Sequence, residues 1–361
     1  MSEDVRRRKE QHLTLAATGD VAARVDAGFD GVTLIHDALP ELAFDAVDTS
    51  CRFLGHRLAL PLVIASMTGG HPMALEVNRT LARVTARQGL AMGVGSQRAA
   101  LLDPEAADSY AVVRREAPDA FLIANIGASQ LVPQAGEAAL TLEDVRLAVG
   151  MIRADALAVH LNALQEVVQP EGQTNAIGWL EAIGRLVEQL DVPVIAKETG
   201  AGISGLVARR LVEVGVAAID VSGLGGTTFA AVEAIRAEER GDLRRAALGH
   251  TLREWGIPTA ASILLAREAG VPLIATGGIA SGLDAAKALA LGASIAGVAR
   301  PALQRALDGE AALDEWVQQF ALELRAAMFL TGSATPDRLR QAAHLLSPAL
   351  RAWTAPLSAD G

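Results

Sequence analysis

The chain has 361 residues, 51% of them hydrophobic and 20% charged, which is the composition of a globular protein with a sizeable core. Its formal net charge of -10 is spread along the sequence and its basic clusters are short, so we expect no nucleic-acid partner. Charge-free runs such as 288–299 are interrupted by glycine and are too short to cross a bilayer, so we expect no membrane partner.

Two features indicate a cytoplasmic protein. Cys51 is the only cysteine, which excludes an internal disulfide and suits a reducing compartment. The first residues, MSEDVRRRKEQHL, lack the apolar segment that follows the basic start of a signal peptide.

The first 55 residues carry no strong period and look like an N-terminal appendage. The stretch VDTSCRFLGHRLALP (47–61), at its end, is expected to form extended segments and turns that lead into the first core strand. From Pro61 onward, eight short apolar runs recur, and each is followed by an Ala-rich amphipathic stretch. The runs are PLVIAS (61–66), LAMGVGS (90–96), FLIANIG (121–127), ALAVHLN (156–162), VPVIAKE (192–198), AAIDVSG (217–223), VPLIATGG (271–278) and SIAGVAR (294–300).

The stretches between these runs carry helix-start signals. Asp103 precedes a proline, Thr141 and Asp144 have the spacing of a capping box, and Ser281 stands before a first turn that contains Asp284. Eight strand–helix units predict an α/β fold, a (β/α)8 TIM barrel at 56–330, with the appendage at 1–55 and a C-terminal helix and tail at 331–361. The longer segment 229–256 is expected to cross the barrel mouth, and one long helix is expected at about 301–329.

The fourth run ends in a polar cluster. Strand alternation puts His160 and Asn162 on one face, with Gln165 and Glu166 just beyond the strand end, where barrels keep their chemistry. Each residue taken alone fits a satisfied core histidine or a helix cap better than a catalytic group. The cluster as a whole favours a functional site.

The sequence GAGISG at 200–205 matches a dinucleotide-binding fingerprint, and Asp220 stands at the distance where that fold places an acidic residue. We nevertheless reject a Rossmann unit. The preceding strand ends in the charged pair Lys197-Glu198, and the unit is the fifth of eight similar ones. These glycines more plausibly make a tight turn or let backbone approach a ligand.

The turns after the last two strands favour a phosphate site. They are 276–279 and 297–300, both glycine-containing and both before helices, and barrels often bind phosphate at this place. Either turn alone would be an ordinary barrel loop as often as a site. Lys197 at a strand end has two open interpretations: it stabilises an electron-rich ring, or it pairs with Glu198.

Taken together, the motifs resemble the family of FMN-dependent type 2 isopentenyl-diphosphate isomerases, from Arg8 to about Leu330. HLNxxQExxQPEG combined with KETGxG and SGxGGT is highly specific. The resemblance is carried by RKEQH (8–12), SMTGG (66–70), GVGSQR (93–98), ANIGA (124–128), HLNALQEVVQPEG (160–172), AKETGAG (196–202), DVSGLGGTTF (220–229), WGIPTA (255–260), ATGGIASGLDAAKALALGA (275–293) and GVARP (297–301).

The resemblance implies interconversion of isopentenyl and dimethylallyl diphosphate by a 1,3-proton shift, with reduced FMN, Mg²⁺ and NAD(P)H as reductant. It also implies a homo-oligomer, a tetramer or an octamer. His160, Asn162 and Gln165 would orient the substrate or relay protons, and Glu166 would bind Mg²⁺. The implied FMN contacts are Ser66, Met67, Thr68, Ser96, Asn125, Lys197, Ser222, Thr227, Gly277, Gly278, Ile279, Ala299 and Arg300. The implied contacts of the diphosphate substrate are Arg8, Lys9, His12, Ser96, Gln97, Arg98 and Gln165.

The sequence departs from the family pattern near Gln173 and Ala176, where the packing of the loop is expected to differ. Two alternatives remain. One is another FMN barrel, such as a 2-hydroxy-acid oxidase or dehydrogenase, although the His-Arg pair that those enzymes use after the late strands is not evident near Ser222 or Thr276. The other is a non-catalytic barrel that binds flavin or phosphate.

Overall fold

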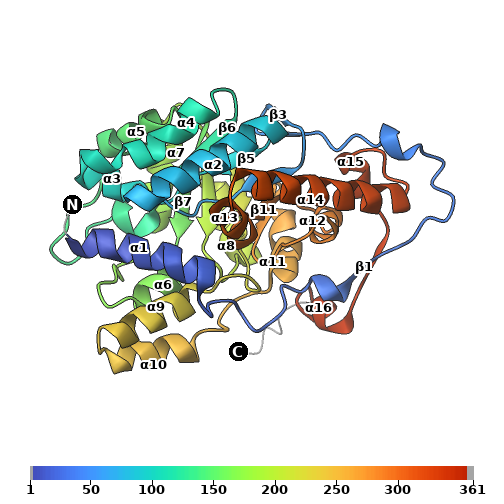
Figure 1. Cartoon of the computed structure of the whole chain (residues 1–361). Coiled ribbons are helices and arrows are strands. Elements are labelled where there is room, and N and C mark those ends of the chain that lie inside the picture. Colours follow the sequence, from blue (N-terminus) through green and yellow to red (C-terminus); the bar gives the residue numbers. More distant parts are fainter. Residues whose placement is uncertain (1–2, 356–361) are drawn as a thin grey trace.

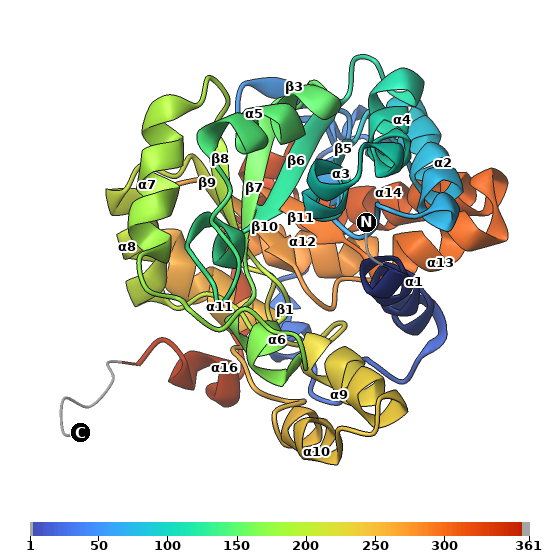
Figure 2. The ribbon, with the colours of Figure 1, turned by 90° about the vertical axis from the view of Figure 1, so that its left-hand side faces the viewer.

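A closed barrel of eight parallel strands forms the centre of the molecule (Figures 1 and 2). The computed structural model describes residues 3–355. Each strand lies within one of the eight predicted runs, which confirms the (β/α)8 barrel. Around the barrel, the strands are β10 (Leu273–Thr276), β11 (Ile295–Val298), β4 (Leu62–Ile64), β5 (Ala91–Gly93), β6 (Phe121–Gly127), β7 (Ala156–Leu161), β8 (Val194–Glu198) and β9 (Ala218–Asp220).

Helices surround this barrel, as the sequence pattern predicts. Two of the predicted helix starts have full capping boxes, Thr141 with Asp144 and Ser281 with Asp284. Asp103 instead caps the 3-10 turn η3 (Pro104–Ala106) that leads into α4. The outer helices are α2 (Pro72–Gln88), α4 (Asp108–Glu116), α5 (Leu142–Met151), α7 (Trp179–Gln189), α8 (Gly205–Glu213), α11 (Thr259–Ala266), α12 (Gly282–Ala290), α13 (Arg300–Asp308) and α14 (Glu310–Leu330).

Inward-facing side chains fill the barrel, and a hairpin closes its lower end. The hairpin consists of β2 (Cys51–Phe53) and β3 (His56–Leu58), and its Phe53 ring meets the Phe121 ring edge to face, with centroids 5.8 Å apart. Phe53 and Leu58 belong to the same buried cluster as Ile123 and Ile195 of the barrel. Because this end is packed, a ligand has access only from the opposite mouth.

The loops at that mouth carry short extra elements. They are α3 (Arg98–Leu102), η4 (Ala128–Leu131), α6 (Ala163–Val168), α9 (Phe229–Glu239) and α10 (Leu243–Thr251). The turn η5 (Arg267–Ala269) instead follows α11 and leads into β10. Helices α9 and α10 form the predicted excursion at 229–256, and α9 packs on α6 and on α10 (Figure 2).

The extended segments predicted at 47–61 are confirmed by the hairpin of β2 and β3, but the sequence pattern did not predict α1 (Glu3–Thr18), a helix that packs against α9 and α13. Its apolar period is weak for a physical reason. Leu13 and Ala17 are buried against the core, whereas Lys9 and His12 of the same helix line the mouth, so polar residues occupy a face that also contacts protein.

The single long helix expected at 301–329 is wrong. The chain breaks at Gly309, whose φ of +117° only glycine adopts easily, and α14 starts in a new direction. Further on, β12 (His344–Leu346) pairs antiparallel with β1 (Val32–Leu34), so the two terminal segments meet beside the barrel. The remaining elements are η1 (Phe29–Gly31), η2 (Phe44–Ala46), α15 (Pro336–Leu339) and α16 (Pro348–Ala352).

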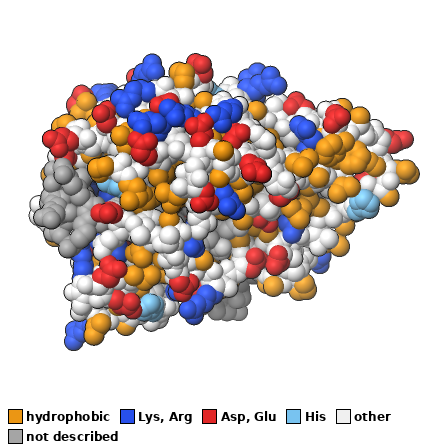
Figure 3. Space-filling model, viewed as in Figure 1, with side chains coloured by type: hydrophobic (Ala, Val, Ile, Leu, Met, Phe, Trp, Pro, Cys, Tyr) orange, Lys and Arg blue, Asp and Glu red, His pale blue; other side chains and the backbone are white. Residues whose placement is uncertain are grey.

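The arginines on the face of the molecule in Figure 3 are paired. Blue and red side chains alternate over α2, α4 and α14, where Arg83 lies 3.0 Å from Glu116 and Arg87 lies 3.1 Å from Asp314. Within residues 3–355, no helix is both long and apolar enough to cross a membrane.

Candidate active site

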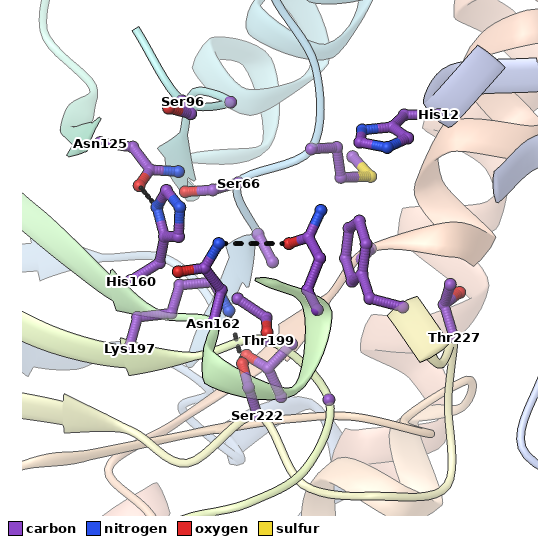
Figure 4. A pocket seen from close by; sticks show the side chains of 18 of the residues that line it. His12, Ser66, Ser96, Asn125, His160, Asn162, Lys197, Thr199, Ser222 and Thr227 are labelled. Carbon is purple, nitrogen blue, oxygen red and sulfur yellow. Dashed lines mark hydrogen bonds between the residues drawn. The ribbon is translucent and has the colours of Figure 1, made fainter. Parts of the chain in front are cut away.

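One large cavity, about 570 Å³, opens at the carboxyl ends of the strands. Cavities of this size hold cofactors and small substrates. Twenty of the site residues predicted from the sequence line it, and Figure 4 shows several of them converging on one space. They are Arg8, Lys9, His12, Ser66, Met67, Ser96, Arg98, Asn125, His160, Asn162, Gln165, Glu166, Lys197, Ser222, Thr227, Gly277, Gly278, Ile279, Ala299 and Arg300.

Strand register places His160 and Lys197 side by side. His160 of β7 pairs with Lys197 of β8, which pairs in turn with Asp220 of β9. Residues in register on neighbouring strands point to the same side of a sheet, so all three face the barrel interior at its mouth. Asn125 of β6 extends this polar row and also lines the cavity.

A hydrogen bond fixes the ring of His160. Its Nδ1 lies 2.8 Å from Oδ1 of Asn125, and the amide nitrogen of Asn125 donates to the carbonyl of Val94 (Figure 4). Asn125 therefore presents an acceptor, and His160 must carry its proton on Nδ1. Burial, together with the charges of Lys9 and Lys197, lowers the pKa of His160 to about 3. The ring is neutral at physiological pH, and Nε2 is left as an acceptor.

Asn162 and Glu166 form the next part of the site. Oε1 of Glu166 accepts from Nδ2 of Asn162 at 2.7 Å, and Oε2 accepts from the backbone N–H of Gln173 at 2.6 Å. Burial raises the pKa of Glu166, and these hydrogen bonds oppose the rise. Oδ1 of Asn162 is buried and has no partner among residues 3–355, so it is an acceptor available to a bound group.

Lys197 is held from two sides. Its ammonium lies 3.1 Å from Oδ2 of Asp220 and donates to the hydroxyl of Ser222, which itself donates to Asp220 at 3.1 Å. The sequence left open a pairing with Glu198, and the structure gives only a bond to its backbone carbonyl, at 2.9 Å. The carboxylate partner is Asp220, which had been considered only in the rejected dinucleotide motif.

The carboxylate of Glu198 holds the GAGISG loop through backbone hydrogen bonds. Its Oε2 accepts the backbone N–H groups of Gly200 and Ala201, at 2.5 Å each, and of Gly202 at 3.2 Å. The donors that a Rossmann loop would offer to a pyrophosphate are therefore occupied by this chain's own carboxylate. Together with the barrel topology, this confirms the rejection of that motif.

Three cations stand on the α1 side of the mouth. Nζ of Lys9 donates to the carbonyl of Ser96 at 3.1 Å, and Arg98 starts α3 immediately after that turn. Arg8 lies 3.9 Å from Glu171. Burial, and then the charges of Arg8 and Arg98, lower the pKa of Lys9 to about 7. These three side chains are charged donors from which a polyanion could accept hydrogen bonds.

Glu233, which sequence reasoning missed, organises this side. It is fully buried on α9, and its Oε1 lies 2.8 Å from Nε2 of His12 and accepts from Nε2 of Gln165 at 3.1 Å. Its other oxygen pairs with Arg236, which is also fully buried. A Glu–Arg pair with i,i+3 spacing on an otherwise Ala-rich helix was the available signal, because isolated charges are rarely buried.

The two predicted phosphate turns also line the cavity. In the described part of the chain, the N–H groups of Gly277, Gly278, Ile279 and Ala299 donate no hydrogen bond to protein. Ala299 is the N-cap of α13. Free donors at a helix start suit a phosphate group, and the pocket offers FMN both this cradle and the polar row of His160 and Lys197.

Two predicted contacts do not reach the cavity with their side chains. Gln97 is buried, and its side chain points away from the cavity. It donates to the carbonyl of Ala148 at 2.7 Å and accepts from the N–H of Asn125 at 2.9 Å. Thr68 lies behind the lining, with its carbonyl bonded to Gly95. The sequence placed both beside true lining residues, but neighbours in a turn point in different directions. Both hold the turns that carry Ser96 and Met67.

The segment that departs from the family pattern is bonded into the site. Oε1 of Gln173 accepts from the hydroxyl of Ser129 at 3.1 Å, and its Nε2 donates to Glu137. Ala176 carries only a backbone bond, from Trp179. The predicted metal ligand Glu166 does not belong to a larger ligand cluster, since residues 3–355 contain no group of three or more His, Cys, Asp or Glu suited to a metal.

A closed barrel with a flavin-sized cavity, a phosphate cradle and a buried lysine defines an FMN-binding barrel. In agreement, the family model described as FMN-dependent dehydrogenase matches residues 152–346. The chain belongs, within that class, to the FMN-dependent type 2 isopentenyl-diphosphate isomerase family. It is 50% identical over 341 residues to isopentenyl-diphosphate delta-isomerase of Halobacterium salinarum, covering 94% of this chain and 93% of the relative.

Other comparisons agree. The chain is 47% identical to the protein of the same name from Xanthobacter autotrophicus, over 93% of this chain and 96% of the relative. Among solved structures, a lactate oxidase from Pediococcus acidilactici aligns with a TM-score of 0.65 over 95% of this chain and 94% of the other, at 16% identity. That identity supports a shared fold and says nothing about a shared substrate.

Proposed function

We propose that this protein interconverts isopentenyl and dimethylallyl diphosphate by a 1,3-proton shift, with reduced FMN and Mg²⁺. The observation that carries the proposal is that one cavity joins three kinds of group. These are a phosphate cradle at 277–279 and 299, a cation cluster of Arg8, Lys9 and Arg98, and a polar row ending in His160. A flavin and a diphosphate can therefore occupy one space.

The cation cluster supports a diphosphate at the α1 side. Two arginines and a lysine supply point charges and forked donors for the non-bridging oxygens of such a group. Glu166 faces the same space, and Mg²⁺ prefers one or two carboxylates combined with phosphate oxygens. A lone Glu166 is therefore a sufficient protein ligand, because the substrate completes the shell.

The polar row supports the proton shift. His160 is neutral with its Nε2 free to accept a hydrogen bond, and Asn162 offers a free oxygen, so both can orient a reacting group without adding charge. Gln165 is held from both ends of its amide: its NH₂ group donates to Glu233 at 3.1 Å, and its carbonyl oxygen accepts from Nδ2 of Asn162 at 3.5 Å. When bound, reduced FMN supplies an electron-rich ring that stabilises positive charge developing on the alkene, together with an acid/base group.

An anaerobic assay tests the proposal. Purified protein with FMN, a chemical reductant and Mg²⁺ is expected to convert isopentenyl diphosphate to dimethylallyl diphosphate without net oxidation. Leaving out the reductant or adding EDTA is expected to abolish turnover. A yellow protein with no isomerisation under the full conditions would contradict the proposal and favour another FMN barrel or a non-catalytic one.

Three finer points also belong to the proposal. NAD(P)H serves as the reductant that primes the flavin, and replacing the chemical reductant by NADPH or NADH tests this. The protein works in the cytoplasm, a location with which the unpaired Cys51 is consistent. It assembles as a homo-oligomer, a tetramer or an octamer, and light scattering on the purified FMN-loaded protein gives its mass directly.

A further inference from the structure

Glu137, which no motif singled out, lies on the mouth loop after β6 and lines the cavity. Its Oε2 accepts from the guanidinium of Arg98 at 2.5 Å. Arg98 is one of the three cations that the proposed function assigns to the diphosphate. In the free protein, a carboxylate of this chain therefore occupies the donor that the substrate would use.

The loop that carries Glu137 is tied to the segment after Glu166. Gln134 and Asn175 exchange bonds, with Nε2 of Gln134 donating to the Asn175 carbonyl and the Asn175 N–H donating back to Oε1, both at 3.0 Å. Gln173 donates from its side chain to Glu137 and from its backbone to Glu166. The same segment thus positions both carboxylates.

Arg8 has a similar carboxylate neighbour, but the two cases differ. Glu171 lies 3.9 Å from Arg8 and is held by Arg236 at 2.7 Å and Arg240 at 2.8 Å. It keeps two cationic partners if a ligand takes Arg8. Glu137 has Arg98 as its single cationic partner among the described residues, and 51% of its side chain is exposed. Of the two, Glu137 is the carboxylate that an entering anion can displace.

The charges at this side of the mouth balance. Arg8, Lys9 and Arg98 face the cavity together with Glu137, Glu166 and Glu171, so three cations meet three carboxylates. A diphosphate without metal brings several further negative charges. It would approach Arg98 while the carboxylate of Glu137 still accepts from that guanidinium, so the two anions would repel each other. With Mg²⁺ bound, the entering group carries less charge, and the repulsion by a carboxylate is smaller.

We propose that Glu137 is a specificity-determining residue that occupies Arg98 in the free protein and makes the site favour Mg²⁺-complexed diphosphate over metal-free diphosphate. The inference rests on the proposed function. Glu137 is expected to move out towards solvent when the ligand binds, because its backbone is held in a turn by mutual bonds with Gln134 at 3.0 and 3.1 Å while its side chain is half exposed.

The test is calorimetric binding of inorganic diphosphate to the FMN-loaded protein, with Mg²⁺ and with EDTA. Glu137→Gln is expected to tighten binding in EDTA by roughly three- to tenfold, as fits loss of one nearby, partly screened negative charge. The gain with Mg²⁺ is expected to be smaller. Glu181→Gln is the matched control, since Glu181 is an exposed carboxylate paired with Arg185 at 2.6 Å on α7, and it is expected to change nothing.

A double variant shows whether Glu137 acts through Arg98. In an Arg98→Ala background, the Glu137→Gln effect in EDTA is expected to fall below about twofold. Unchanged or weaker binding by Glu137→Gln would overturn the inference, and weaker binding only with Mg²⁺ would identify Glu137 as a metal ligand instead. If the unmodified protein bound no diphosphate under either condition, the proposed function itself would fall.

Discussion

Glu233 accepts a hydrogen bond from His12 across 221 residues of chain, at 2.8 Å, and this contact joins α1 to α9 at the edge of the cavity. The same carboxylate holds Gln165 on α6 and Arg236 on its own helix. One buried charge therefore sets the position of two side chains that the proposed function places at the substrate. The N-terminal helix belongs to the active site because of it.

Replacing Glu233 by Gln should lower the free energy of unfolding. The change leaves Arg236, whose side chain is 0% exposed, with Glu171 as its one carboxylate partner among the described residues. Breaking a buried ion pair from one side typically costs about 3–5 kcal/mol, and we expect a loss near the lower end because Glu171 remains. Urea denaturation measures it. The control is Glu238→Gln on the same helix, where an exposed pair with His250 should contribute less than about 1 kcal/mol.

Because of Glu233, the stability of the fold should also depend on pH in the acid range. Burial raises the pKa of Glu233, but its interactions with His12, Arg236 and Gln165 outweigh burial and lower the pKa to about 2. A carboxyl whose folded pKa lies below its unfolded value stabilises the fold above the unfolded pKa. This contribution should be lost as the pH falls from about 4.5 towards 2, and it should be absent from the acid unfolding curve of Glu233→Gln.

Which parts of the fold follow from the sequence depends on where the side chains point. The eight strands were predictable because strands buried on both faces are continuous apolar runs, and all eight runs contain a barrel strand. Helix α1 was not, because Lys9 and His12 face the cavity and interrupt its apolar period. The break at Gly309 was missed because a single glycine within a helical pattern is usually tolerated.

The residues of the site were also predictable in part, depending on whether their position follows from the barrel topology. Residues at strand ends, such as His160 and Lys197, were found because barrel topology fixes where those ends lie. Asp220, which pairs with Lys197, and Glu233, which pairs with Arg236, were not assigned these roles, since a buried ion pair depends on which elements meet in space. The family resemblance implied that Gln97 contacts the substrate, but the direction of the backbone turns its side chain towards Ala148.

His160 should not titrate near neutrality. Burial, Lys9 and Lys197 lower its pKa to about 3, far below that of an unfolded chain. Imidazole nitrogen NMR should therefore show one Nδ1-protonated form throughout pH 5 to 9, with the signal assigned by its loss in His160→Gln. Because the unfolded chain takes up the proton first, stability should also fall as the pH drops from about 6.5 towards 3. A midpoint near 6.5 for this ring would contradict the structure.

Lys9 should make diphosphate binding depend on pH. Its pKa is lowered to about 7 by burial and by Arg8 and Arg98, so its charge is lost as the pH rises through that value. We expect the affinity for inorganic diphosphate to fall by roughly fivefold or more between pH 6 and 8.5, relative to Lys9→Arg, which stays charged. The double replacement of Arg8 and Lys9 by Ala should raise KM at every pH. Parallel pH curves for the wild type and Lys9→Arg would show that Lys9 does not titrate in this range.

Replacing Glu166 should weaken Mg²⁺ binding without weakening flavin binding. Glu166→Gln keeps a hydrogen-bond acceptor for the Gln173 N–H but removes the charge that Mg²⁺ needs. We expect the stimulation of diphosphate binding by Mg²⁺ to drop by at least tenfold, while the flavin absorbance of the purified protein stays unchanged. Loss of flavin from this variant would mean that Glu166 supports the FMN site, and it would remove the case for a metal role.

The phosphate cradle gives the last prediction. Gly277 has a φ of +111°, and a Cβ placed on it would lie 2.2 Å from the carbonyl oxygen of Gly223, so Gly277→Ala must move one of two backbone turns. Gly270→Ala is the matched control: its φ of +82° carries a similar strain of about 1–2 kcal/mol, but its Cβ would meet nothing within 4 Å. We expect Gly277→Ala to be purified with little FMN, by the ratio of flavin to protein absorbance, and Gly270→Ala to retain it. Equal loss in both variants would attribute the effect to backbone strain alone, and equal retention would place the FMN phosphate away from this turn.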